Sequence, residues 1–213
     1  MTMRILLLVL ALLALAMPAT AAPTPSLPNS PTWARTGPLV IRVGDNTTPA
    51  WRPYLERAVA DWNAGAARTN IRFVIVPGKS EPATCKPVFG TVQVCAASYG
   101  ANGFYGYANF WPSGGKTVQA VVRLNMHYLA RQGPARWQSV ITHELGHAIG
   151  LSHNDAANGN TNTGSVMDNT NDPEGLKPPY GPKSALAPSE DDWATLARLY
   201  APAGKTQLAQ TKP

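Results

Sequence analysis

Apolar residues follow two patterns along the chain, short runs or alternations in some segments and a three-to-four-residue spacing in others. The first pattern predicts strands and the second predicts helices. The predicted strands are Leu39–Val43, Ile71–Val76, Thr91–Val94, a strand or ribbon within Tyr99–Trp111, and Thr117–Asn125. In the last of these, Val118, Ala120, Val122 and Leu124 share one face. The other face is more polar, so we expect this strand near an edge of a sheet.

Three segments have the helical spacing. Gly65 ends the first and Pro134 begins the second, whereas Ser189 begins the third with Asp192 in the capping-box position. Their apolar faces consist of Trp51, Leu55, Ala58, Val59 and Trp62; of Trp137, Val140, Ile141, Leu145 and Ala148; and of Trp193, Leu196, Ala197 and Tyr200. This order of strands and helices predicts a mixed α/β (α+β) domain in which a sheet packs against helices.

The first residues have the pattern of an export signal. Arg4 precedes the apolar run Ile5–Met17, and small residues at Ala19 and Ala21 form a cleavage site, so we expect residues 1–21 to be a signal peptide. A retained membrane anchor is the alternative, but 13 helical residues span only about 20 Å of a ~30 Å hydrocarbon core. No other apolar stretch is long enough to cross a membrane. The mature chain is therefore expected to be secreted, extracellular or periplasmic.

The mature chain divides into three parts by composition. Residues 22–36 are rich in proline and read as an extended leader, residues 37–201 contain the predicted elements, and residues 202–213 read as a flexible tail. With 44% hydrophobic and 14% charged residues, the chain has enough apolar material for a core. The net charge is +6 without a dense Lys/Arg cluster, so nucleic-acid binding is not expected. A basic surface could favour anionic partners or only aid solubility, and we expect a monomer.

The chain contains two cysteines, Cys85 and Cys95. In an exported protein such a pair is expected to form a disulfide. Two buried free thiols are one alternative, and a thiolate that binds a metal is another.

Three of the four histidines lie between residues 143 and 153, in His-Glu-Leu-Gly-His-Ala-Ile-Gly-Leu-Ser-His. His143 and His147 are four residues apart on a predicted helix, so their rings project from one face and can meet at a single ion. Gly150 can end the helix and turn the chain back, which brings His153 in as a third ligand. Three imidazoles leave the fourth position of a tetrahedral Zn²⁺ open for water, which is typical of a catalytic site. The alternative is a helix whose histidines lie at the surface without a metal.

Glu144 follows the first of these histidines and is rotated from it by about 100° on the helix. Its carboxylate can therefore reach a metal-bound water rather than the metal. Zinc lowers the pKa of such a water to about 7, and a carboxylate can accept its proton during attack on a carbonyl. We therefore predict that Glu144 is the catalytic base in the hydrolysis of an acyl bond, most naturally a peptide bond.

This motif resembles that of the metzincins, a group of zinc proteases with the pattern H-E-x-x-H-x-x-G-x-x-H and a later methionine-containing turn. The matching residues are His143, Glu144, His147, Gly150 and His153, and Gly164-Ser165-Val166-Met167 looks like the turn. The resemblance implies that Met167 lies beneath the histidines as an apolar base; read alone, Met167 fills a hydrophobic gap. The compact size and the last helix look most like the matrixins and their bacterial relatives.

The resemblance also implies a fold and a partner. The fold would be a twisted, mostly parallel sheet with an antiparallel edge strand, an active-site helix and a C-terminal helix. Residues 37–201 would be the zinc metalloprotease catalytic domain, with one catalytic zinc ion and no organic cofactor. Thr117–Asn125 would be the edge strand above the cleft, pairing with a protein or peptide substrate bound in extended form.

Some alternatives stay open at this point. The stretch Asn154–Asp172 is rich in Asn and Asp, which could bind Ca²⁺ or form a solvated loop. A zinc amidase that acts on cell-wall peptides would use the same constellation. A non-catalytic zinc-binding secreted protein would need the histidines but not Glu144, so the presence of Glu144 argues against it.

Overall fold

The computed structural model of the chain describes residues 31–154, 165–168 and 186–201. Each predicted strand and helix is present, and two four-residue helices, α2 and α3, are additional. In chain order the elements are β1 (Leu39–Asn46), α1 (Arg52–Ala64), α2 (Ala66–Thr69), β2 (Ile71–Pro77), β3 (Thr91–Ala97), β4 (Gly106–Ser113), β5 (Lys116–Asn125), α3 (Met126–Leu129), α4 (Pro134–Ala148) and α5 (Glu190–Leu199).

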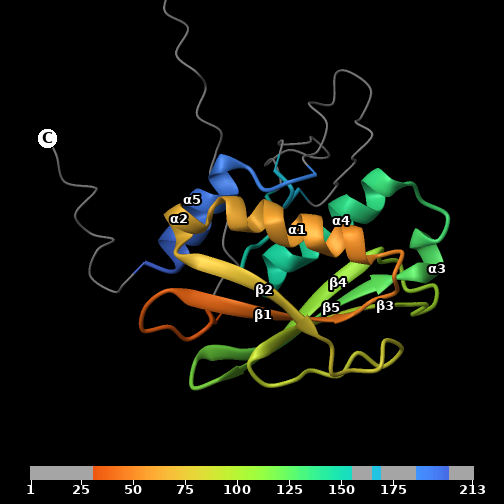
Figure 1. The fold of residues 1–213 in the computed structure, drawn as a ribbon, viewed down its shortest axis with the longest axis horizontal. Helices are drawn as coiled ribbons and strands as arrows, with labels where there is room; N and C mark the ends of the chain where they lie inside the picture. The colour runs from red at the N-terminus through yellow and green to blue at the C-terminus, as the bar shows by residue number, and fades with distance from the viewer. Residues whose placement is uncertain (1–30, 155–164, 169–185, 202–213) are drawn as a thin grey trace, which may run out of the picture.

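The five strands form one twisted sheet in the order β2-β1-β3-β5-β4 (Figure 1). The first four are mutually parallel, and β4 pairs with β5 in the antiparallel direction. Parallel neighbours need a crossover, and α1 supplies it between β1 and β2. The fold is thus mixed α/β, with a mostly parallel sheet and an antiparallel edge strand, as predicted.

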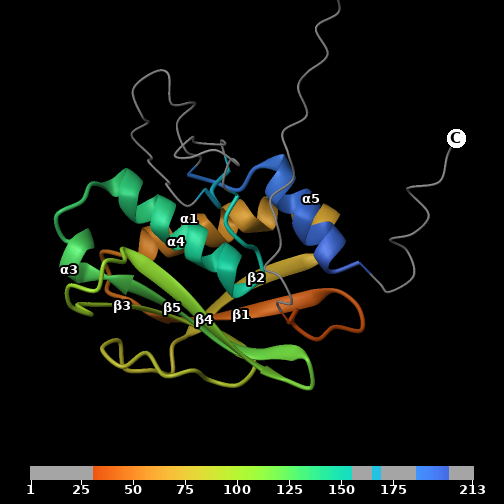
Figure 2. The ribbon, with the colours of Figure 1, turned by 180° about the vertical axis from the view of Figure 1, so that it is seen from behind.

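Helices α1 and α4 cover one face of the sheet, and α5 lies beside α2 at the end of this helical layer (Figures 1 and 2). The core lies between this layer and the sheet. It contains the inward residues of β1 and β5, such as Ile41 and Leu124, and the apolar faces of the helices, such as Leu55 and Ile141. Burial of these side chains is the main source of the free energy that holds α4 against the sheet.

The edge of the sheet differs from the expectation. Thr117–Asn125 is not the edge strand: β5 lies between β3 and β4, and β4 is the edge. The more polar face of β5 is nevertheless covered, because Val121 packs against Cys85 and Cys95, which a disulfide joins. The covering loop, which carries Cys85 and joins β2 to β3, is distant from β5 in the sequence, so the alternation of residues within β5 could not reveal it.

The folded domain begins before Gly37, where the proline-rich leader was expected to end. Trp33 is buried, and it pairs with Thr117 at the start of β5. Its indole N–H donates to the carbonyl of Ala148 at the end of α4, at 2.9 Å. From the other end of the chain, the hydroxyl of Tyr200 donates to the carbonyl of Ile149, also at 2.9 Å. Both ends of the described chain therefore hold the last turn of α4.

Several expectations concern residues outside those described. The signal peptide (1–21), most of the leader (22–36), the tail (202–213) and most of the calcium-binding candidate Asn154–Asp172 belong to this group. They stay predictions. Within the described residues, no helix has the length and apolar character needed to span a membrane.

Candidate metal centre

The candidate site lies on α4, which is buried along most of its length, from Gln138 to Gly146. Helix α1 packs against it and fixes its position. The ring of Trp51 stacks on that of Trp137 with centroids 4.4 Å apart. The indole N–H of Trp62 donates to a main-chain carbonyl of α4 at 3.0 Å, one residue before the first histidine. A helix held on several sides presents its polar side chains at defined places.

His143 and His147 lie one helical turn apart on α4, with ring centroids separated by 4.5 Å. After α4, Gly150 adopts a φ of +100°, which favours glycine because it has no Cβ. Its N–H donates to the carbonyl of His147 at 2.9 Å, and the next N–H, of Leu151, donates to that of Gly146. The chain thereby reverses and returns His153 to the two helical histidines.

The three imidazoles converge on one point. One ring nitrogen from each histidine lies within 4.8 Å of those from the other two. The Nε2 atoms of His147 and His153 are 3.1 Å apart, close to the about 3.4 Å that separates two nitrogens on one tetrahedral zinc ion. The prediction of a three-histidine site requires His153 to face the two histidines of α4, and it does so.

The other ring nitrogens of the helical histidines contact main-chain carbonyls. Nδ1 of His143 lies 2.7 Å from the carbonyl of Val166, and Nδ1 of His147 lies 2.7 Å from that of Leu151. These contacts place the proton on Nδ1 and leave Nε2 with its lone pair. Burial lowers the pKa of His143 well below its ordinary value and that of His147 to about 4. Both rings are therefore neutral at pH 7, as metal ligands must be.

Glu144 is buried beside the histidines, and desolvation raises the pKa of its carboxyl to about 8. Among the described residues, Oε2 of Glu144 is a buried oxygen without a hydrogen-bond partner. Such an orphaned atom is costly unless a further group completes the site. Three converging imidazoles and a buried carboxyl group with one unpartnered oxygen form a donor set that fits a zinc ion with a water molecule.

The edge strand passes directly over this carboxylate. A Cβ on Gly106, the first residue of β4, would lie 2.7 Å from Cγ1 of Val140 and 3.0 Å from Oε1 of Glu144. Only glycine permits so close an approach of β4 to α4. The antiparallel edge and the candidate base thus lie side by side.

Met167 is fully buried and contacts the turn of α4 that joins the two helical histidines. Its sulfur lies against Gly146, where any Cβ would collide with it, and the carbonyl of Met167 accepts from the N–H of Asn154 at 2.8 Å. The preceding carbonyl, of Val166, is the one that contacts His143. The segment 165–168 therefore underlies the site, while Gly164 lies outside the described residues.

Sequence reasoning brought together the three histidines, Glu144 and Met167, but it missed several contributors. The carbonyls of Leu151 and Val166 orient two imidazoles, and main-chain atoms carry no sequence signal. Gly106 had a weak signal, since a glycine within a strand suggests close approach of another group. Asp192 was assigned only to helix capping, although it also contacts Ser165.

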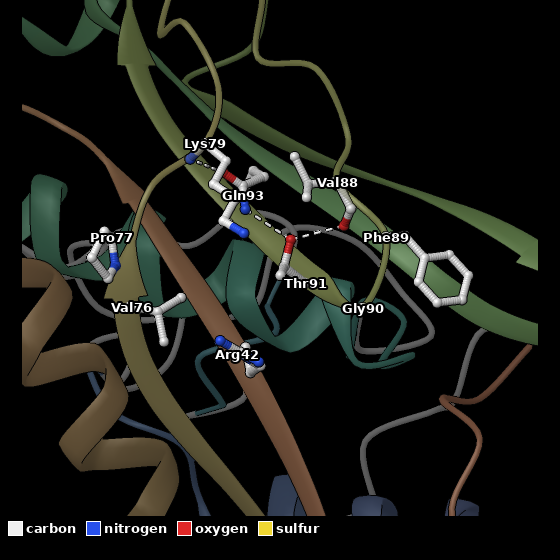
Figure 3. Close-up of a pocket in the computed structure, with 9 residues that line it drawn as sticks. All are labelled: Arg42, Val76, Pro77, Lys79, Val88, Phe89, Gly90, Thr91 and Gln93. Carbon is white, nitrogen blue, oxygen red and sulfur yellow. Dashed lines mark hydrogen bonds between the residues drawn. The ribbon is translucent and has the colours of Figure 1, made fainter.

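A hollow lies on the face of the sheet away from α4 (Figure 3). Arg42, Lys79 and Phe89 are among its lining residues, with Gln93 in its floor. The amide of Gln93 already has partners, because Nε2 donates to Thr91 at 2.7 Å and Oε1 accepts from the N–H of Lys79 at 2.9 Å. No histidine, cysteine or carboxylate is among its described lining residues. The group of side chains able to hold a metal ion therefore lies at the α4 site and not in this hollow.

Comparisons with known proteins agree with this reading of the α4 site. Residues 39–176, more than half of the chain, match the model of a family described as dual-action HEIGH metallo-peptidases. The letters HEIGH, read as residues 143–147, differ from this chain only in having isoleucine where Leu145 stands. No curated protein sequence matches the chain.

Two of the solved structures that match the chain do so over most of its length, and one of them is named as a zinc protease. The structure of myroilysin matches with a TM-score of 0.49 at 13% identity, covering 80% of this chain and 96% of that one. High choriolytic enzyme 1, a hatching-enzyme zinc protease from the medaka fish Oryzias latipes, matches with a TM-score of 0.46 at 15% identity, covering 84% and 98%.

Proposed function

Because this chain belongs to the family of dual-action HEIGH metallo-peptidases and is a zinc metallopeptidase, we propose that it is an endopeptidase in which Glu144 is the general base. His143, His147 and His153 hold the zinc ion. The observation that carries the proposal is the convergence of three imidazole nitrogens beside a buried carboxylate oxygen that has no partner among the described residues.

The chain's own residues divide the work of hydrolysis. When bound, zinc supplies a Lewis acid that polarises the scissile carbonyl and lowers the pKa of a coordinated water to about 7. Desolvation raises the pKa of the Glu144 carboxyl to about 8 in the metal-free protein, and the positive charge of a bound zinc ion would lower it and favour the carboxylate. As a carboxylate, Glu144 accepts the proton of the attacking water and then delivers it to the departing amine, so the proton balance closes within one turnover. The two main-chain carbonyls hold the rings of His143 and His147 in the tautomer that leaves Nε2 free.

The substrate is a protein or peptide segment in extended form. We assign its docking strand to β4, because β4 is the antiparallel edge of the sheet and Gly106 brings it against Glu144. An exposed edge offers main-chain donors and acceptors to an added strand, which is a general mode of peptide capture. This assignment replaces Thr117–Asn125, which lies inside the sheet.

The proposed chemistry is tested with Glu144→Gln. This change keeps the shape of the side chain but removes its basicity, so we expect full zinc content and a 10²–10⁴-fold loss of kcat, the usual contribution of a general base. Glu56→Gln, at an exposed position on α1, is the matched control and should keep wild-type activity. Wild-type turnover by Glu144→Gln would overturn the mechanism. Casein and peptidoglycan, assayed in parallel, separate an endopeptidase from a cell-wall amidase.

We also propose that the mature protein is secreted as a monomeric, matrixin-like enzyme after loss of residues 1–21. The disulfide between Cys85 and Cys95 supports secretion, since such bonds persist mainly in oxidising compartments. N-terminal sequencing of the exported protein should begin at Ala22. Full-length chain confined to the cytosol would contradict secretion, and a dimer in light scattering would contradict the monomer.

A further inference from the structure

Asp192 is a fully buried carboxylate whose two oxygens have different partners. Oδ2 accepts from the N–H and the hydroxyl of Ser189, at 2.7 and 2.9 Å, and so completes the capping box at the start of α5. Oδ1 accepts from the hydroxyl of Ser165 at 2.7 Å. Capping explains the first oxygen, whereas the second reaches out of the helix to the segment beneath the metal centre.

Ser165 relays this contact toward the histidines. Its Oγ accepts the N–H of Met167 at 2.9 Å while it donates to Asp192, so the hydroxyl fixes the turn between residues 165 and 167. The carbonyl of Val166, the residue enclosed by this turn, lies 2.7 Å from Nδ1 of His143. These residues are all buried, so water does not readily replace a lost bond.

We propose that Asp192 is a positioning residue of the metal centre, which acts through Ser165 to place the Val166 carbonyl against His143. The inference rests on the proposed role of His143 as a ligand. A charged acceptor makes a stronger hydrogen bond than a neutral one, so Asp192 is suited to hold the hydroxyl of Ser165 in one orientation. The Val166 carbonyl then fixes the ring plane of His143. Loss of such an outer partner typically weakens metal affinity 10–100-fold.

The geometry provides matched variants that separate positioning from capping. Ser165→Ala removes the relay but leaves the capping box intact. Ser189→Ala removes the hydroxyl partner of Oδ2 but leaves the bond between Asp192 and Ser165. Ser165→Thr keeps a hydroxyl at the relay position and serves as the rescue variant. Asp192→Asn, alone and combined with Ser165→Ala, tests whether Asp192 acts through Ser165.

The experiment measures zinc affinity by chelator competition, the visible spectrum of the Co²⁺-substituted protein, and the Tm of the metal-free protein. We expect Ser165→Ala to bind zinc 10–100-fold more weakly with a shifted Co²⁺ spectrum, and Ser165→Thr to recover most of the affinity. Ser189→Ala should lower Tm while its zinc affinity stays within about twofold of wild type. In the Ser165→Ala background, Asp192→Asn should cause no further loss of affinity, as expected for two residues in one relay.

Two results would overturn the inference. One is wild-type zinc affinity and Co²⁺ spectrum in Ser165→Ala. The other is loss of affinity in Ser189→Ala and Ser165→Ala in proportion to their loss of Tm, which would indicate a purely structural role. Failure of the wild-type protein itself to bind zinc would instead refute the proposed function, so the two failures are distinguishable.

Discussion

Replacement of Gly146 by alanine should destabilise this protein, although the same change stabilises most helices. Gly146 lies inside α4, where alanine is favoured over glycine by about 1 kcal/mol. Here a Cβ would lie 2.9 Å from Cζ2 of Trp62 and within collision distance of the sulfur of Met167. Both neighbours are buried, so they have little room to move. Overpacking of this kind costs about 1–3 kcal/mol.

The two effects give a net loss of about 1 kcal/mol, within a range of roughly zero to 2. For a domain of this size, that corresponds to a fall in Tm of about 2–4 °C. Thermal unfolding of the metal-free protein in a chelator is the suitable assay, because bound zinc would mask the change. Ala60→Gly, at an exposed position within α1, measures the helix preference for alanine over glycine in the same protein.

Gly146→Ala should also weaken zinc binding, because displaced Met167 moves the adjoining Val166 carbonyl away from His143. This prediction is contradicted if Gly146→Ala raises Tm by the amount that Ala60→Gly lowers it and leaves zinc affinity unchanged. That pair of results would mean that Met167 adapts freely and does not form a fixed floor under the site.

Three further predictions follow from other parts of the molecule. Gly106→Ala places a methyl group against Glu144, so kcat/KM for a peptide substrate should fall while zinc content stays constant. Unchanged kcat/KM would contradict the assignment of β4 as the strand that binds the substrate. The double serine variant of Cys85 and Cys95 removes a disulfide across a separation of 10 residues, which stabilises the folded state by about 3 kcal/mol. Tm should therefore fall by about 6–12 °C without loss of zinc, and an unchanged Tm would contradict this expectation. Burial raises the pKa of Tyr99 to about 12, so the folded state keeps a proton that the unfolded chain loses near pH 10, and stability should fall as pH rises from 10 to 12. Urea midpoints across this range should decline less steeply in Tyr99→Phe, and an equal decline would exclude Tyr99 as the cause.

The sequence predicted those features that local spacing encodes. The pair His143 and His147 follows from the helical period, and the return of His153 follows from the conformational freedom of Gly150. Strand positions followed from apolar runs in the same way. A helix of four residues, such as α2 or α3, is too short for a period to be visible, and both were missed.

The remaining errors concern contacts between distant segments. The polar face of β5 suggested an open strand, but Arg123 on that face donates to the carbonyls of Thr84 and Cys85 in the covering loop. Trp33 looked like part of a leader because it follows a proline-rich segment, yet its buried indole fixes this segment to α4. Such contacts form only when distant segments meet in the folded protein, so they produce no periodic pattern of residues in a single sequence.

Trp33 and Tyr200, from the two ends of the described chain, both bond to the end of α4, and this limits how many N-terminal residues the protein can lose. The carbonyls of Ala148 and Ile149 belong to the last turn of a helix, where no intrahelical donor remains for them, and Trp33 and Tyr200 satisfy them instead. A maturation protease that stops before residue 32 leaves this arrangement whole. Cleavage after Trp33 would remove the indole that caps the end of α4, from which the chain turns toward His153. Protein molecules cut at this later position would therefore bind less zinc.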